Sequence, residues 1–389
     1  MKICGIIAEY NPLHLGHVKQ ITYAKEKLGA ENIVVIMSGN FTQRGEPAIL
    51  NKYKRAREAI LAGADLVIEL PTVFATANAE IFAKGAVSIL NALGSIDGIC
   101  FGVESGTKEE YISLALALNN ETKEFKKILK EKLDTGVSLA KAKFLTLKEL
   151  GEDYDETLIG SPNNILGIEY TKAIIALNSK MEIYPLLREG DHNEEKYKKG
   201  ITSAKSIRNM VKEGKTKKIK SSVPEFVYKD LGDFPFSFDK FSMLKLLTTS
   251  PEELKDVLDC TEGLENRIKA LSKDNLSLDT LVEKVTTKRY SEARVRRIIT
   301  ANMLGIKKDL ILKSLDSDLY AKVLAVSSDK KDLISYLSKN SSIPLVTRKS
   351  EYLGLKKSAK NCFDKDVLAN DIYNLICSEK ENEFLTLFV

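Results

Sequence analysis

Four short apolar runs in the first 110 residues constrain the fold of this chain more than any other feature. They cover residues 3–8, 33–37, 66–70 and 98–101, and none alternates between apolar and polar positions. Helical patterns separate them at about residues 17–28, 53–62 and 78–93, the last with Asn78 at the capping position. Strands that are apolar on both faces and separated by helices are typical of a parallel sheet covered on both sides. We therefore predict an α/β fold with helices on both faces of a parallel sheet.

The pattern changes further along the chain. Residues 107–150 predict two or three helices rich in Lys and Glu, residues 164–177 another helix, and residues 181–187 a further strand. After about residue 220 short helical patterns dominate as far as residue 311, with a candidate strand at 320–326 and a last helix near 367–378. We place a domain boundary in the lysine-rich stretch 190–220. It divides the chain into residues 1–210 and a mostly α-helical C-terminal region, residues 211–389.

Composition and charge limit the classes of function. At 389 residues the chain exceeds one ordinary core, and no apolar stretch approaches the roughly 20 residues of a membrane helix. Its five cysteines are scattered and contain no CxxC pair, which favours reduced thiols in the cytoplasm and disfavours a zinc site. Residues 1–190 carry a net charge of −2 and residues 191–389 a net charge of +7. A basic second half suggests a polyanionic partner, although many basic regions are only solvated surfaces.

Two of the three histidines, His14 and His17, stand in a turn between the first predicted strand and the first predicted helix. The amides and the dipole of a helix N-terminus attract anionic oxygens, so this turn suits the phosphates of a nucleotide. Gly16 has no side chain and would let a ligand approach the backbone. Two imidazoles can donate hydrogen bonds to charge that develops on a leaving pyrophosphate. The alternative is two histidines in an exposed turn without a function.

Other candidates follow the remaining strands, because ligands of such sheets bind beyond the carboxyl ends of the strands. Residues 38–47 form a polar loop with two glycines and Arg44, which an ordinary turn does not need. Gly102 would let a purine or ribose lie against the backbone, and Asn163 would contact adenine or ribose, although a capped helix start explains Asn163 equally well. Arg188 is a candidate phosphate ligand. We expect no task for His192.

Two segments of the second half combine hydroxyls or cations in a way that suits phosphates. Residues 201–208 place three hydroxyls, Lys205 and Arg208 at a helix start, either as a second phosphate clamp or as a capped surface helix. The stretch of residues 284–308 contains eight Lys and Arg but one acidic residue within the run. Ser291 is a natural cap for a helix over 292–304. We expect the arginines on the exposed side of this helix, spaced to meet RNA phosphates, or else as a solvated face. The RNA-binding candidates are Lys288, Arg289, Arg294, Arg296 and Arg297.

The motifs together resemble a known family. His14 and His17 match the HxGH motif of the HIGH-type nucleotidyltransferase superfamily, and residues 201–208 match loosely its second signature, with Thr202-Ser203 where a doubled serine is usual. More narrowly, the chain is similar to the tRNA(Met) cytidine acetate ligases in the stretches GIIAEYNPLHLGH, MSGNFTQRGEPA, GADLVIELP, SPNNILGIEY and KRYSEARVRR. The residues after about 310 contribute little to this resemblance.

The resemblance implies a Rossmann-like nucleotidyltransferase sheet in residues 1–210 and a tRNA-binding role for residues 211–389. It implies an enzyme that activates acetate with ATP, with Mg²⁺ bridging phosphates, and acetylates the wobble cytidine of elongator tRNA(Met). The catalytic candidates are His14, His17, Arg188 and Lys205. The ATP cradle carried over by position consists of Ile7, Ala8, Glu9, Tyr10, Asn11, Pro12, Leu13, His14, Leu15, Gly16, His17, Val18, Lys19, Gln20, Gly102, Asn163 and Arg188. No residue is expected to bind a metal, and no membrane or protein partner is evident.

Two alternatives remain open at the level of sequence. A small-molecule adenylyltransferase of coenzyme biosynthesis would account for the first half equally well, but it leaves the basic second half without a role. A binding module that uses ATP only to shape an RNA site is the other alternative.

Overall fold

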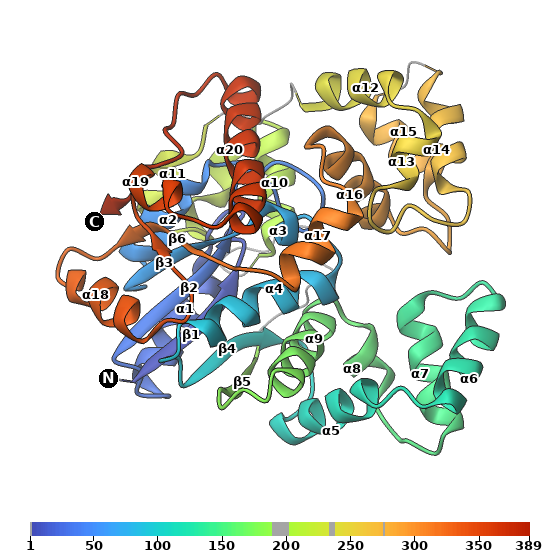
Figure 1. The fold of residues 1–389 in the computed structure, drawn as a ribbon, viewed down its shortest axis with the longest axis horizontal. Coiled ribbons are helices and arrows are strands. Elements are labelled where there is room, and N and C mark those ends of the chain that lie inside the picture. Colours follow the sequence, from blue (N-terminus) through green and yellow to red (C-terminus); the bar gives the residue numbers. More distant parts are fainter. Residues whose placement is uncertain (1, 189–201, 233–237, 275–276) are drawn as a thin grey trace.

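The computed structural model describes residues 2–188, 202–232, 238–274 and 277–389, and one eight-stranded sheet lies at the centre of this part of the chain (Figure 1). The strands are β1 (Ile3–Ala8), β2 (Asn32–Ser38), β3 (Leu66–Leu70), β4 (Gly98–Val103), β5 (Glu182–Leu187), β6 (Ala321–Val326), β7 (Leu345–Val346) and β8 (Leu387–Phe388). Strands β5, β4, β1, β2 and β3 lie side by side in this order and run parallel. The predicted parallel sheet is confirmed, and its carboxyl ends meet at one edge.

The predicted helices of the first half are confirmed with boundary shifts of one or two residues. They are α1 (Leu15–Glu26), α2 (Lys52–Leu61), α4 (Ala79–Ala92) and α9 (Pro162–Ala176). The short helix α3 (Thr72–Ala75) was not predicted. Asn78 caps α4 as expected, because its side chain accepts a hydrogen bond from the Ile81 amide at 3.1 Å. Helix α1 begins earlier than predicted, because His14 acts as its cap.

The sheet is buried on both faces, which explains why its strands show no polar alternation. In β2 the side chains of Ile33, Val35 and Met37 pack in one core with α1 and α2. Val34 and Ile36 point to the other face and pack in a second core with α4 and α9.

Between β4 and β5 the chain leaves the sheet through four helices, α5 (Lys108–Asn119), α6 (Lys123–Asp134), α7 (Leu139–Glu149) and α8 (Glu156–Gly160). The first three confirm the predicted helices of residues 107–150. Figure 1 shows α6 and α7 at the periphery of the molecule, away from the sheet.

The second half is mostly helical, as predicted. It contains α10 (Ala204–Lys212), a 3₁₀ turn at Thr216–Ser221, α11 (Glu225–Asp230), α12 (Phe238–Thr248), α13 (Pro251–Lys255), α14 (Leu264–Ser272), α15 (Leu278–Val285), α16 (Glu292–Met303) and α17 (Lys308–Leu315). Helices α12 to α16 gather in one group beside the sheet (Figure 1). Among the described residues no helix has the length and apolar composition needed to cross a membrane.

The end of the chain returns to the sheet. The candidate strand at 320–326 is confirmed as β6, which pairs antiparallel with β3, and β7 and β8 pair with β6. The remaining helices are α18 (Lys331–Asn340), α19 (Lys349–Leu353) and α20 (Lys357–Cys377), the last about ten residues longer than expected. The division at residue 210 stays a prediction, but the sheet does not end there: residues beyond 320 complete its edge.

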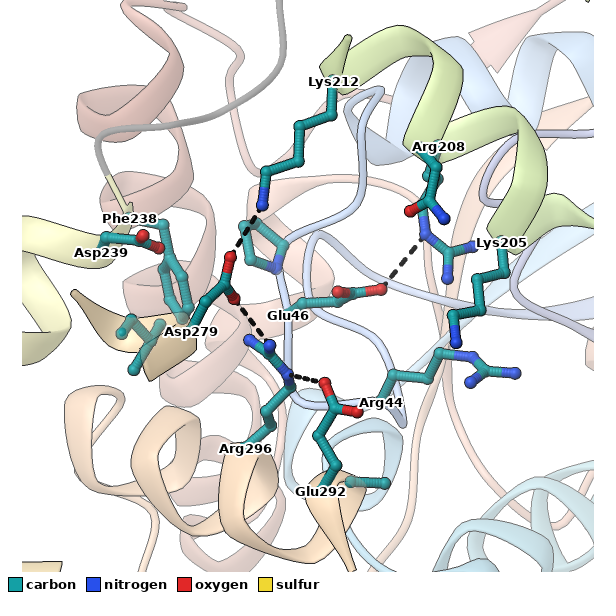
Figure 2. A pocket seen from close by; sticks show the side chains of 14 residues that line it. Arg44, Glu46, Lys205, Arg208, Lys212, Phe238, Asp239, Asp279, Glu292 and Arg296 are labelled. Carbon is teal, nitrogen blue, oxygen red and sulfur yellow. Dashed lines mark hydrogen bonds and ion pairs between the residues drawn. The ribbon is translucent and has the colours of Figure 1, made fainter. Parts of the chain in front are cut away.

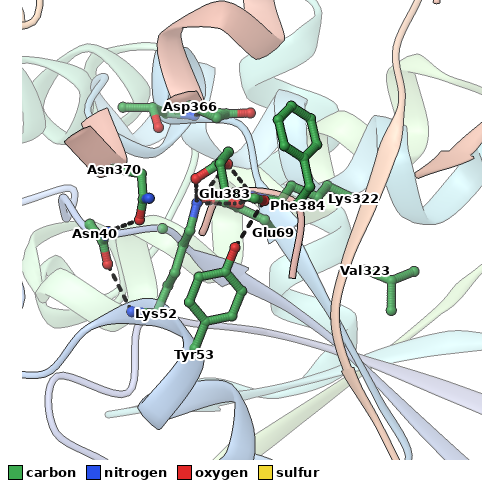
Figure 3. A network of polar contacts seen from close by, with 12 residues as sticks. Asn40, Lys52, Tyr53, Glu69, Lys322, Val323, Asp366, Asn370, Glu383 and Phe384 are labelled. Atoms are coloured by element: carbon green, nitrogen blue, oxygen red, sulfur yellow. Dashed lines mark hydrogen bonds and ion pairs between the residues drawn. The ribbon is translucent and has the colours of Figure 1, made fainter. Parts of the chain in front are cut away.

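A buried cluster of charges ties this last segment to the first half (Figure 3). Lys52 Nζ lies 2.9 Å from Glu69 and 2.7 Å from Glu383, and Lys322 pairs with the same two carboxylates. All four side chains are at most 4% exposed. Burial lowers the pKa of Lys322, but the charges of Glu383 and Glu69 raise it well above its usual value. The cluster therefore holds two cations against two anions where α2, β3, β6 and the C-terminal segment meet.

Candidate active site

The histidine turn at the end of β1 is built by hydrogen bonds within itself. His14 Nδ1 accepts a hydrogen bond from the Gly16 amide at 3.1 Å, and His17 Nδ1 accepts one from the His14 amide at 3.2 Å. The two rings stack, with centroids 3.7 Å apart. A Cβ at position 16 would lie 2.9 Å from His14 Cε1, so the glycine leaves room for this ring. The turn is thus a helix cap made of two imidazoles.

These caps determine which ring nitrogens can donate. Because each Nδ1 accepts a backbone hydrogen bond, the proton of each neutral imidazole lies on Nε2. The donor nitrogen of each ring is therefore Nε2, and both rings lie at the N-terminus of α1, where the helix dipole already favours an anion. This arrangement suits the stabilisation of phosphate oxygens.

The polar loop at residues 38–47 is fixed against the histidine turn. The Gln43 amide donates to Glu9 Oε1 at 2.7 Å, and the Ile49 amide donates to Asn11 Oδ1 at 2.9 Å. Arg55, which is fully buried in α2, donates to the carbonyls of Glu9 and Ser38 at 2.6 and 3.0 Å. Sequence reasoning missed Arg55, because nothing in a basic helical stretch distinguishes a buried arginine from an exposed one.

Gly102, Asn163 and Arg188 meet at the carboxyl ends of β4 and β5. A Cβ on Gly102 would lie 2.9 Å from Arg188 Cδ, so the arginine packs directly over this glycine. Asn163 Nδ2 donates to Glu104 Oε1 at 2.5 Å. Burial lowers the pKa of Arg188 to about 10, and the charge of Glu104 acts in the opposite direction. The structure therefore groups these three predicted residues on one side of the sheet edge.

The cradle segment Ile7–Gln20 spans the end of β1, the turn and the first turns of α1. Gln20 Nε2 donates to the Cys100 carbonyl at 2.9 Å, which joins α1 to β4. The histidine turn and the Gly102 group consequently belong to neighbouring strands of the same edge. In the described part of the chain no group of three or more His, Cys, Asp or Glu side chains is arranged to hold a metal ion.

The second signature begins at the start of α10 and lies beside the histidine turn. The Ser203 side chain caps α10 by accepting from the Ser206 amide at 3.1 Å. Arg208 is buried; its Nη1 donates to the Asn11 carbonyl at 2.9 Å and its Nε lies 3.2 Å from Glu46 Oε1. Lys205 is exposed. Ile201 and His192 lie outside the described residues.

A charged cavity of about 300 Å³ lies between the 38–47 loop, α10 and the start of α16 (Figure 2). Its walls include Arg44, Glu46, Lys205 and Arg208. Burial lowers the pKa of Arg208, and the charge of Glu46 raises it. Two residues of the predicted second signature, Lys205 and Arg208, therefore line this cavity.

The expected exposure of the arginines on α16 is wrong for all three of them. Arg294 donates to the Asp259 carbonyl, Arg296 pairs with Asp279 at 2.7 Å and Glu292 at 2.9 Å, and Arg297 is 14% exposed. The helix packs against the 38–47 loop, since Thr300 Oγ1 donates to the Gly45 carbonyl at 2.7 Å. These contacts together cover the side expected to face solvent. Lys288 and Arg289 precede the helix and are exposed.

Comparisons with known proteins agree with this architecture. The family model described as HIGH Nucleotidyl Transferase matches residues 1–386. A protein of Caldanaerobacter subterraneus subsp. tengcongensis named tRNA(Met) cytidine acetate ligase is 39% identical over 96% of this chain and 95% of its own length. A protein of the same name from Acetivibrio thermocellus is 39% identical over 96% of this chain and 94% of its own.

Two solved structures also superpose over the whole chain. Apo TmcAL of Thermotoga maritima has a TM-score of 0.94 and 28% identity, with full coverage of both chains. TmcAL of the same organism bound with alpha-thio ATP has a TM-score of 0.91 and 29% identity, again over 100% of both chains. With these matches the chain belongs to the HIGH nucleotidyl transferase family and, within it, to the family of the tRNA(Met) cytidine acetate ligases.

Proposed function

We propose that the protein is an ATP-dependent acetate ligase that forms N4-acetylcytidine at the wobble position of elongator tRNA(Met), with release of AMP and pyrophosphate. The observation that carries the proposal is the 39% identity over 96% of the chain to relatives named tRNA(Met) cytidine acetate ligase. The alpha-thio ATP bound to the similar TmcAL chain supports ATP as the substrate. The histidine turn supplies the chemistry that such a reaction needs.

In the activation step an acetate oxygen attacks the α-phosphorus of ATP, and the bond to pyrophosphate breaks. The Nε2–H groups of His14 and His17 donate to the leaving pyrophosphate, and the N-terminus of α1 adds its dipole. Lys205 and Arg188 neutralise the remaining phosphate charge. A free carboxylate needs this activation because the cytosine amine is a poor nucleophile.

The nucleotide is held by the cradle Ile7–Gln20 together with Gly102, Asn163 and Arg188. The close packing of Arg188 over Gly102 supports this grouping, because it brings a cation to the carboxyl ends of β4 and β5. A bound Mg²⁺ would neutralise part of the charge of the ATP phosphates.

The helical region serves the tRNA in this proposal. The wobble base is unpaired in the anticodon loop, so turning it outward costs little. Lys288 and Arg289 contact the flanking RNA backbone from the protein surface. Arg294, Arg296 and Arg297 hold α16 in place, and their positive charges attract only RNA phosphates that lie close to this helix. Residues 1–210 activate acetate, and the region from 211 provides the RNA surface.

We also place the reaction in the cytoplasm, where tRNA is modified. The five cysteines form no disulfide in the described residues, which suits a reducing compartment.

The small-molecule adenylyltransferase is not favoured, because the relatives that match almost the full chain carry the ligase name. An acetate-dependent exchange of labelled pyrophosphate into ATP tests the activation step without tRNA. We expect exchange only when acetate is present. Exchange that does not depend on acetate would contradict an acetyl-adenylate intermediate. Folded protein that shows no exchange would contradict it as well.

A further inference from the structure

The cavity beside the 38–47 loop has the size and position of an acceptor site. Its volume of about 300 Å³ lies at the lower end of the roughly 300–1,000 Å³ typical of small-ligand pockets, so it suits one nucleoside better than a longer RNA segment. Pro47 and Phe238 give it an apolar wall against which a flat base can pack. Arg44 is exposed at its border and can meet a phosphate next to that nucleoside.

One side chain joins this cavity to the ATP cradle. Arg208 donates to the Asn11 carbonyl in the cradle, while its Nε lies 3.2 Å from Glu46 Oε1 in the cavity. Figure 2 shows Glu46 reaching across the cavity toward Arg208. Only the guanidinium of Arg208 therefore lies between a group bound against Glu46 and the ATP cradle.

Glu46 is also the carboxylate best placed to receive a new partner. Both oxygens of Asp279 are engaged, one by Lys212 at 2.8 Å and the other by Arg296 at 2.7 Å. Asp239 lies on the opposite wall from Arg208 (Figure 2). Glu46 lines the cavity and its side chain is 26% exposed. Its Oε1 is buried 3.2 Å from Arg208 Nε, so a ligand in the cavity would contact Oε2.

From these observations we infer that the cavity binds the cytosine base that is acetylated, with its exocyclic amine against the Glu46 carboxylate. The inference rests on the proposed function and assigns its acceptor site. In the transfer step the amine nitrogen bonds to the carbonyl carbon of acetyl-adenylate, and the bond between that carbon and the AMP phosphate oxygen breaks. AMP leaves with the electron pair. The proton lost by the amine passes to Glu46 and then to water, while Arg208 stays cationic beside the cradle.

The variant Glu46→Gln separates the two steps of the reaction. It removes the proton acceptor but keeps the size of the side chain, so acetate-dependent pyrophosphate exchange should stay within twofold of the wild type. Acetyl transfer to tRNA(Met) in single turnover should fall about 100-fold or more, the usual effect of losing a general base. Glu379→Gln is the matched control. Glu379 is 23% exposed and pairs with Lys54, and Glu46 is similarly 26% exposed and pairs with Arg208. The control should be normal in both assays.

Two results would overturn the inference. One is acetyl transfer by Glu46→Gln at the wild-type rate; the other is loss of exchange and transfer together, which would show that Glu46 acts in the activation step.

Arg44→Ala is a second test. We expect a several-fold rise in KM for tRNA(Met) and unchanged exchange. An unchanged KM would contradict the assignment of the cavity border to RNA phosphates. A wild-type protein without acetate-dependent exchange would instead refute the proposed function, so the two failures are distinguishable.

Discussion

The imidazole rings of His14 and His17 stack 3.7 Å apart while each Nδ1 accepts a hydrogen bond from the backbone of the same turn. The pair therefore has a structural task, which is to cap α1, and the two Nδ1 acceptors place the proton of each neutral ring on Nε2. Capping and catalysis can be separated experimentally, because other residue types cap a helix without an imidazole donor.

His14→Asn should retain stability and lose activity. Asparagine is a preferred cap, whereas His14→Ala should cost about 1 kcal/mol of unfolding free energy because the Gly16 amide loses its acceptor. Both variants should lower acetate-dependent pyrophosphate exchange about 100-fold, since each loses one donor to the leaving group. Urea unfolding and the exchange assay measure the two effects. Wild-type exchange by His14→Asn would show that the ring serves only as a cap.

Arg55→Met should destabilise the protein strongly. The guanidinium is fully buried and donates to the carbonyls of Leu50, Glu9, Ser38 and Gly39, which the variant leaves unsatisfied. We expect a loss of about 3 kcal/mol in urea unfolding. Arg57→Ala on the same helix is the control: Arg57 is 47% exposed and pairs with Asp230, and it should cost less than about 1 kcal/mol. Equal effects of the two variants would contradict the anchoring role of Arg55.

Glu58→Gln should stabilise the protein increasingly as the pH rises. Glu58 is fully buried, and among the described residues neither carboxylate oxygen has a hydrogen-bond partner. Burial raises its pKa from 4.5 to about 8, and the charge of Asp230 adds to the rise. The folded state then holds a proton that the unfolded state loses, so wild-type stability falls between about pH 4.5 and 8.

The advantage of Glu58→Gln over the wild type should therefore grow through this window, by up to about 1.4 kcal/mol per pH unit. Urea unfolding at several pH values checks the trend. Glu26→Gln, at an exposed position of α1, should show none. A difference between Glu58→Gln and the wild type that is independent of pH would show that Glu58 ionises normally in the fold.

Replacing Lys288 and Arg289 with alanine should weaken tRNA binding without affecting activation. Both side chains are exposed, and Arg289 pairs with Glu262 at 2.6 Å, so their removal costs RNA phosphate contacts and one surface ion pair rather than packing. The slope of log affinity against log salt should fall by about 1 to 2, corresponding to two lost contacts. Lys313→Ala, at a 79% exposed position of α17, is the control. An unchanged affinity and an unchanged salt slope would show that these two residues do not contact the RNA.

Local patterns predicted the elements of this fold well, because strands such as residues 33–37 and caps such as Asn78 depend on nearby residues. The position of β6 beside β3 could not be predicted, since its partner lies about 250 residues earlier and an apolar strand does not encode which neighbour it pairs with. Arg294 and Arg297 were misplaced for a related reason. Arg294 donates to the Asp259 carbonyl and Arg297 donates to the Gln43 carbonyl on the 38–47 loop, and only these tertiary contacts show that the polar side of the helix is covered. The candidate site was predictable where a motif was local, as at the histidine turn, and not where Arg55 or Arg208 joins distant loops.

The most direct test of the account is mass spectrometry of the nucleosides of tRNA(Met) after incubation with the protein, ATP and ¹³C-labelled acetate. The account predicts one labelled acetyl group on the wobble cytidine, formed only when ATP is present and accompanied by stoichiometric AMP. A tRNA without labelled cytidine, or nucleotide transfer to a small metabolite instead, would contradict it.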